Sequence, residues 1–135
     1  MGQAMQKSTL IAAICGSLAA PVHAQVLTGN DLLGACEVQG ATVQAGFCLG
    51  YIVGVIEGLK LGAAIPLLAA RDENSEQEPI DPLTNSFLHM CIPAESENSQ
   101  SVDIAVKYLR ANPDIRHNPA RGLILASLRE AYPCP

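Results

Sequence analysis

Basic side chains are scarce in this sequence, which carries eight Lys and Arg against thirteen Asp and Glu, a net charge of −5. Proteins that bind nucleic acid or an anionic membrane surface depend on clustered positive charge. The acidic balance therefore argues against both kinds of partner. It suits a basic protein partner, although charge that serves solubility alone accounts for it equally well.

Residues typical of catalytic sites are also sparse. Only three histidines are present, and only His89 and His117 lie beyond the N-terminal segment. The sequence contains no nucleophile elbow, no metal-binding helix motif and no phosphate-binding glycine loop. Its carboxylates are concentrated in one acidic stretch, where rigid positioning is hardest. We therefore expect a binding protein without a metal or cofactor, and not an enzyme.

The N-terminal segment predicts export. One basic residue, Lys7, precedes an apolar run over residues 10–20, which is about half the length of a membrane span. Small residues at Val22 and Ala24 fit the specificity of signal peptidase, so cleavage is expected after Ala24. The segment 1–24 is then a signal peptide, and residues 25–135 form a single exported domain. Ile14 before Cys15 argues against a lipidated cysteine.

Four cysteines remain after cleavage, namely Cys36, Cys48, Cys91 and Cys134. An even number of cysteines in an oxidising compartment predicts disulfides. A zinc site built from His89, Cys91, His117 and Cys134 is the alternative, but its spacing matches no common zinc-finger pattern.

Hydrophobic spacing predicts about four main helices and no strands, so the expected fold class is all-α. Residues typical of helix starts and stops set the boundaries. The expected helices cover Thr28 to Cys36, about Thr42 to Pro66, Ser96 or Ser99 to the residue before Asn112-Pro113, and Asn118-Pro119 to the residue before Pro133. The first two form a hairpin and the last two an antiparallel pair. This arrangement favours the disulfides Cys36–Cys48 and Cys91–Cys134.

Between the second and third expected helices, residues 71–85 are acidic and contain two prolines. Such a composition has little to bury, so we expect an exposed loop, and loops of this length are often functional. The residues expected to bind a partner are its acids and neighbouring apolar side chains: Asp72, Glu73, Glu76, Glu78, Asp81, Ile80, Leu83 and Phe87. A solvated linker is the alternative.

The second helix contains glycine at every fourth position, namely Gly46, Gly50, Gly54, Gly58 and Gly62. Glycine is unfavourable within a helix, so five of them need a reason. A groove of small residues lets another helix approach closely, within the domain or in a homodimer. Five such residues therefore predict close helix packing.

The same helix is long enough to cross a membrane, but Glu57 and Lys60 near its centre would be costly there. Glu57 could be a carboxylate with an unusual environment. The simpler interpretation is that it faces solvent or pairs with Lys60.

Several short motifs occur in a fixed order along the chain. They are Leu32-Leu33-Gly34-Ala35-Cys36, Phe47-Cys48-Leu49-Gly50-Tyr51-Ile52-Val53-Gly54, Cys91-Ile92-Pro93, Val106-Lys107-Tyr108-Leu109, Asn112-Pro113, Arg116-His117, Pro119-Ala120 and Ala131-Tyr132-Pro133-Cys134. Together they resemble the Rap/Tai family of periplasmic immunity proteins, which neutralise amidase effectors of type VI secretion. The resemblance covers nearly all of residues 25–135.

The resemblance implies an all-helical protein, often a homodimer, that blocks the active site of a peptidoglycan-cleaving amidase. The chain departs most from the family in the acidic stretch. Because immunity proteins recognise their toxins through variable surfaces, the identity of the toxin stays open. The alternative function is a small envelope chaperone or structural binding protein without a toxin partner.

Overall fold

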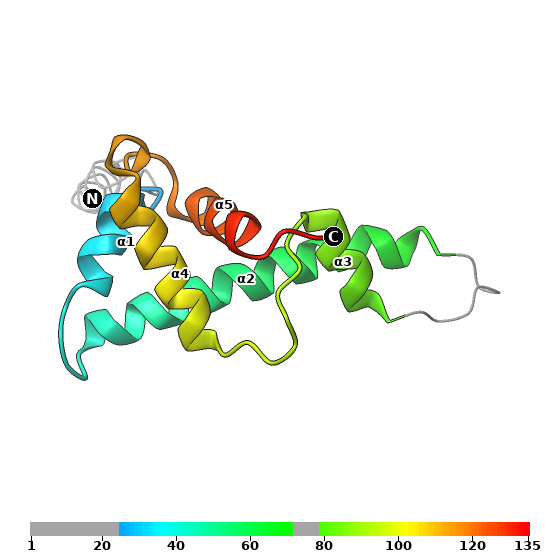
Figure 1. Ribbon diagram of the computed structural model, residues 1–135, viewed down its shortest axis with the longest axis horizontal. Coiled ribbons are helices and arrows are strands. Elements are labelled where there is room, and N and C mark those ends of the chain that lie inside the picture. Colours follow the sequence, from blue (N-terminus) through cyan, green and yellow to red (C-terminus); the bar gives the residue numbers. More distant parts are fainter. Residues whose placement is uncertain (1–24, 72–78) are drawn as a thin grey trace, which may run out of the picture.

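The computed structural model describes residues 25–71 and 79–135. The predicted signal peptide therefore lies outside the described residues. The described chain contains five α-helices and one 3-10 helix and is all-α, as predicted (Figure 1). Their order is α1 (Gly29–Cys36), α2 (Val43–Ala69), α3 (Ile80–Leu88), α4 (Asn98–Ala111), η1 (Pro113–Ile115) and α5 (Ala120–Ala131).

Helix α1 follows Thr28, where the sequence predicts a helix to start, and a reciprocal cap formed by Thr28 and Asp31 begins it. The Thr28 hydroxyl and backbone N–H donate to the Asp31 carboxylate over 2.6 and 3.0 Å. These bonds, the hydroxyl bond foremost, lower the pKa of Asp31. Because the charged form is favoured in the folded chain, the cap stabilises the fold at neutral pH. That contribution is lost as acid protonates the carboxylate.

Helix α2 is the central element of the fold. It begins after Thr42, whose hydroxyl accepts from the N–H of Ala45. Its buried side chains, Cys48, Ile52, Ile56 and Ala63, follow helical spacing along one side. The helix continues past Pro66 to Ala69, so this proline lies within its last turn.

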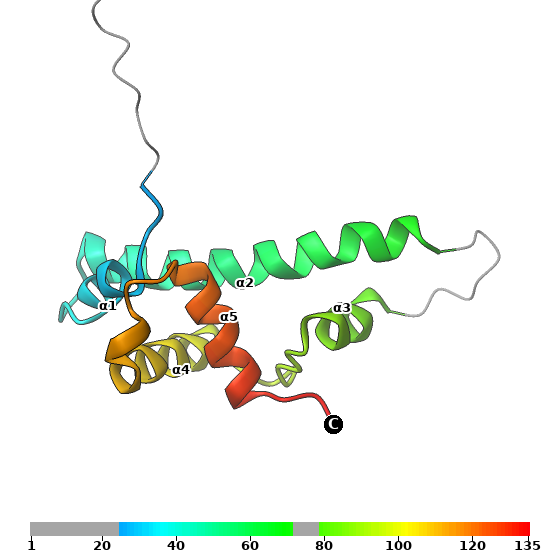
Figure 2. The ribbon, with the colours of Figure 1, turned by 90° about the horizontal axis from the view of Figure 1, so that it is seen from above.

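The core lies between α2 and the helices α1, α4 and α5. Figures 1 and 2 show α4 and α5 against the N-terminal half of α2, whereas α3 accompanies its C-terminal half. The side chains least accessible to solvent are large and apolar. They include Leu32, Ile52, Met90, Leu109, Ile124 and Leu128.

Two helix boundaries differ slightly from those expected. Helix α4 is capped by Glu97 and not by Ser96 or Ser99, since the Glu97 N–H donates to the Gln100 side chain over 2.8 Å. Helix α5 begins at Ala120, with Pro119 and not Asn118 at its cap. The observed caps differ from the predicted ones by one or two residues, which is common because helix ends fray.

Helix α3 corrects the predicted loop over residues 71–85. Residues 80–85 are helical, and the helix continues to Leu88. Thr84 and Leu88, four residues apart, are buried on one face. Its C-terminal cap is His89, which has a left-handed backbone with φ of 51°. Residues 72–78, the rest of the predicted loop, lie outside the described residues.

The two predicted disulfides are confirmed. Cys36–Cys48 joins the end of α1 to the first half of α2, and Cys91–Cys134 joins the segment before α4 to the segment after α5. The second bond lies in a small hydrogen-bonded cluster, in which the Cys91 N–H donates to Tyr132 O over 2.9 Å. Arg129 also donates from Nε to Leu88 O over 2.7 Å, so α5 and the end of α3 are held together.

The start of α1 is held against the start of α5. Gly29 N–H donates to Asn118 O over 3.0 Å, and Ala120 N–H donates to Leu27 O over 2.8 Å. Gly29 is buried, and a Cβ placed on it would lie 2.5 Å from Leu123 Cδ1 and 3.0 Å from Arg116 O. Only glycine allows this approach without a shift of the neighbouring atoms.

Candidate interaction surface

The side of α2 that faces away from the core is apolar and exposed. Large side chains along it are among the most accessible in the chain, with Val43 87%, Leu61 64% and Ile65 59% exposed. Its other large apolar members are Phe47 and Leu68, and the Phe47 and Tyr51 rings stack with centroids 5.7 Å apart. We call this side of α2 the apolar α2 face. An exposed apolar surface of this kind is typical of interaction sites.

The five glycines of α2 are open to solvent and not covered by another helix. A Cβ placed on Gly46, Gly50, Gly54, Gly58 or Gly62 meets no atom of the described chain within 4 Å, outside its own helix and chain neighbours. The expected close packing within the domain is therefore wrong for the described residues, because the helices of the core cover the opposite side of α2. Packing of these glycines in a homodimer stays a prediction.

Helix α2 is also long and apolar enough to cross a membrane by length and composition, with a mean hydropathy of 1.8 over its most apolar window. Core helices of soluble domains pass the same test. In α2, Ile52 and Ile56 belong to the core shared with α1, α4 and α5, and Glu57 is exposed near the middle. Helix α2 therefore has a core side, although only 22% of its most apolar window is buried.

The structure describes four of the eight residues that the sequence predicts to bind a partner. Ile80 and Asp81 form the first turn of α3, and the exposed Phe87 lies near its end. Leu83, which the sequence places beside them, is 37% exposed on the same helix. Asp72, Glu73, Glu76 and Glu78 lie outside the described residues, so their role stays a prediction.

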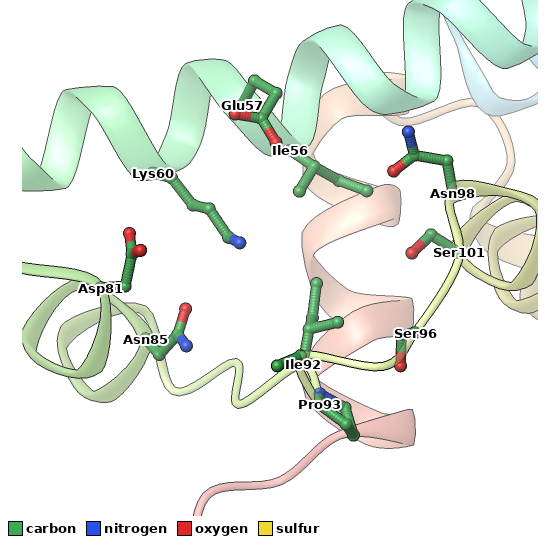
Figure 3. Close-up of a pocket in the computed structure, with 11 residues that line it drawn as sticks. Ile56, Glu57, Lys60, Asp81, Asn85, Ile92, Pro93, Ser96, Asn98 and Ser101 are labelled. Carbon is green, nitrogen blue, oxygen red and sulfur yellow. The ribbon is translucent and has the colours of Figure 1, made fainter.

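A polar pocket of about 230 Å³ opens between α2, α3 and the first turn of α4 (Figure 3). Sequence reasoning did not identify it, because its side chains come from segments far apart in the chain. The one signal was the apolar neighbourhood of Glu57. The pocket is lined by Ile56, Glu57, Lys60, Asp81, Asn85, Ile92, Pro93, Ala94, Ser96, Asn98 and Ser101.

Neither the zinc site nor a Glu57–Lys60 pair is formed. Cys91 and Cys134 are oxidised to a disulfide, and the described residues contain no group of three or more His, Cys, Asp or Glu that could hold a metal. The described residues do contain an ion pair elsewhere, between Arg110 and Glu37 at 3.2 Å. Glu57 is exposed, as the simpler interpretation expects.

These features define a small helical domain with two disulfides, whose most distinctive described surfaces are an apolar helix face and a polar pocket. A family model described as Rap1a immunity proteins matches residues 28–134, so the chain belongs to the Rap1a immunity protein family. Membership suggests an immunity function against a toxin, and such proteins are typically non-enzymatic inhibitors. Comparisons with curated proteins and with solved structures found no match.

Proposed function

We propose that this chain is a periplasmic immunity protein that binds and blocks a peptidoglycan-cleaving amidase toxin of a type VI secretion system. The match to an immunity family over residues 28–134 carries the proposal. The amidase target and the secretion system rest on the resemblance of the sequence motifs to the Rap/Tai proteins. An inhibitor needs only to cover the toxin's active site with complementary surface of about 1,600 Å² in total.

The disulfides and the N-terminal segment support the periplasmic location. Disulfides persist in oxidising compartments and are rare in the cytosol. Both pairs, Cys36–Cys48 and Cys91–Cys134, fasten this fold. Peptidoglycan lies in the same compartment as an exported inhibitor, so a toxin that cleaves it would be met at its site of action.

We expect the purified, oxidised protein to inhibit a secreted amidase encoded beside its gene at a molar ratio near one. The measurement is release of cleaved peptide from purified peptidoglycan at increasing inhibitor concentration. In cells that produce the amidase in the periplasm, the full chain should restore growth. A variant without residues 1–24 should not, because it stays in the cytosol.

Undiminished amidase activity at a tenfold excess of inhibitor would contradict the proposal for that toxin. If the protein instead suppresses aggregation of unrelated unfolded proteins, that result would favour the alternative function as an envelope chaperone. Intact mass supplies a separate control on export, since cleavage after Ala24 and oxidation should give residues 25–135 less four hydrogens.

We also propose that the protein forms a homodimer through the apolar α2 face. Large exposed side chains lie toward both ends of this face, Val43 and Phe47 at one end and Leu61 and Ile65 at the other. Between them, Gly50, Gly54 and Gly58 lie in open space. An antiparallel second copy would place the glycines of each chain over those of the other, with the large side chains of opposite ends in contact. This is the self-complementary arrangement of a twofold interface.

Leu61→Glu should disrupt this dimer, because it introduces two charges into a surface that would otherwise exclude water. We expect the dissociation constant to rise at least about thirtyfold, the equivalent of ~2 kcal/mol. Sedimentation velocity over a range of concentrations measures it. Folding should be intact, since Leu61 is 64% exposed in the single chain.

Ala111→Glu is the matched control, because it adds the same charge at an exposed position at the end of α4. Its dissociation constant should equal that of the unmodified chain. An unmodified chain that sediments as a monomer at every concentration, or a Leu61→Glu dimer of full strength, would exclude the apolar α2 face as the dimer interface.

A further inference from the structure

The pocket beside α3 contains a buried polar atom that the described chain leaves without a partner. Ser101, at the start of α4, is only 4% exposed. Figure 3 shows it directed into the pocket. Asn85 Oδ1, on the opposite wall, is buried and has no hydrogen-bond partner among the described residues. Buried polar groups usually have partners, so this oxygen points to a bound group.

The charged groups of the pocket form no ion pair among the described residues. Lys60 extends from α2 into the middle of the pocket, and no ion pair within 4 Å joins it to Asp81 or to Glu57 (Figure 3). The lining thus carries two carboxylates against one ammonium group, a net charge of −1. This negative balance favours a positively charged group with several donors. Lys60 has a flexible four-carbon stem and can leave the pocket while its charged end stays in water.

The size of the pocket favours a single side chain of a protein partner over a small-molecule ligand. At about 230 Å³ it is smaller than the 300–1,000 Å³ typical of pockets for small-molecule ligands. It is open to the surface between three helices, where a protein partner could place one side chain. Arginine side chains that fill such pockets are common anchors of protein–protein interfaces.

We propose that this pocket is a subsite for one cationic side chain, arginine in particular, of the toxin that the protein binds. The inference rests on the proposed immunity function. Asn85 Oδ1 and the Asp81 carboxylate accept hydrogen bonds from the guanidinium group, and the Ser101 hydroxyl accepts one at the base of the pocket. A planar guanidinium has five N–H donors and can serve these acceptors together.

The test uses no toxin, so its result is independent of whether the protein inhibits an amidase. The oxidised, isotope-labelled protein is titrated with Nα-acetyl-arginine amide, Nα-acetyl-glutamine amide or Nα-acetyl-glutamate amide. NMR shifts are followed at the Asn85 side-chain amide and the Ser101 backbone amide. We expect saturable shifts at both positions with the arginine probe in the millimolar range, and weaker or no binding of the other two.

Two charge variants give effects of opposite sign. Asp81→Asn removes an acceptor and a negative charge, so it should weaken binding of the arginine probe about twofold to fivefold, as for a partly exposed ion pair. Lys60→Met removes the like charge, so it should strengthen binding by a similar factor. Asp114→Asn and Lys107→Met are matched controls at exposed positions that do not line the pocket, and should change nothing.

Preference for the glutamate probe, with weaker binding in Lys60→Met, would show that the subsite takes an anion and would overturn the proposal. Equal binding of all three probes, or no saturable shift at Asn85 and Ser101, would overturn it as well. Unchanged spectra of both variants away from α2, α3 and α4 establish that the fold is intact.

Discussion

Removing the Cys91–Cys134 disulfide by alanine at both positions should lower the free energy of unfolding by about 4 kcal/mol. The bond closes a loop with a sequence separation of 43, so its loss frees a long segment of the unfolded chain. Typical domains are stable by only ~5–15 kcal/mol, and this one is small. Denaturant unfolding followed by circular dichroism measures the change.

The matched variant replaces Cys36 and Cys48 by alanine. That bond closes a separation of only 12 residues, so the expected loss is smaller, about 3 kcal/mol. The loss in free energy of unfolding should be larger for the Cys91–Cys134 variant than for the Cys36–Cys48 variant, and this order is a stricter test than either value alone. A larger loss from the shorter loop would mean that native packing around Cys48, which is buried in the core, outweighs loop entropy.

Gly29→Ala should destabilise the fold by about 1–3 kcal/mol, through overpacking at a site with no spare room. The added Cβ would lie 2.5 Å from Leu123 Cδ1, which can move, and 3.0 Å from Arg116 O, which belongs to the backbone. Relief therefore requires a shift of the segment before α5. Thermal or denaturant unfolding reports the effect.

Gly54→Ala is the counterpart at an exposed position, where a Cβ meets open space. Alanine is the better helix former, so this variant should gain about 0.5–1 kcal/mol. Both substitutions are made in the Leu61→Glu background, so that association does not contribute. If both variants lose stability to the same extent, the close approach at Gly29 is not the cause of its loss.

Much of the fold follows from local signals in the sequence. The Thr28–Asp31 cap and the Thr42 start are hydrogen bonds between residues three apart, which a sequence displays directly. The disulfide pairing also followed, because helix order alone decides which cysteines share an end of the fold. These are short-range or topological features, and the structure confirms them.

Helix α3 was missed because its prolines resemble loop residues. Pro79 and Pro82 lie at the cap and in the first turn of the helix, where a missing N–H removes no internal hydrogen bond. The contrary signal was the four-residue spacing of Ile80, Thr84 and Leu88, which places the three on one face of a helix. Nine residues give too short a pattern to outweigh two prolines and a run of acids.

The candidate surfaces were harder to predict than the helices. Spacing identified the glycines of α2 but could not say which side of that helix the core would cover. The sequence favoured a covered groove, whereas the other helices pack opposite it. The pocket depends on Lys60, Asp81 and Ser101, which meet only when α2, α3 and α4 assemble.

The division of α2 into a buried and an open side has a consequence for the evolution of this protein. Substitutions at exposed positions usually alter stability by less than ~0.5 kcal/mol. Positions such as Val43, Leu61 and Ile65 can therefore drift with little effect on the core that Ile52 and Ile56 help to form. A lineage can acquire or abandon a contact partner through this side of one helix, while the disulfide-linked scaffold behind it stays the same.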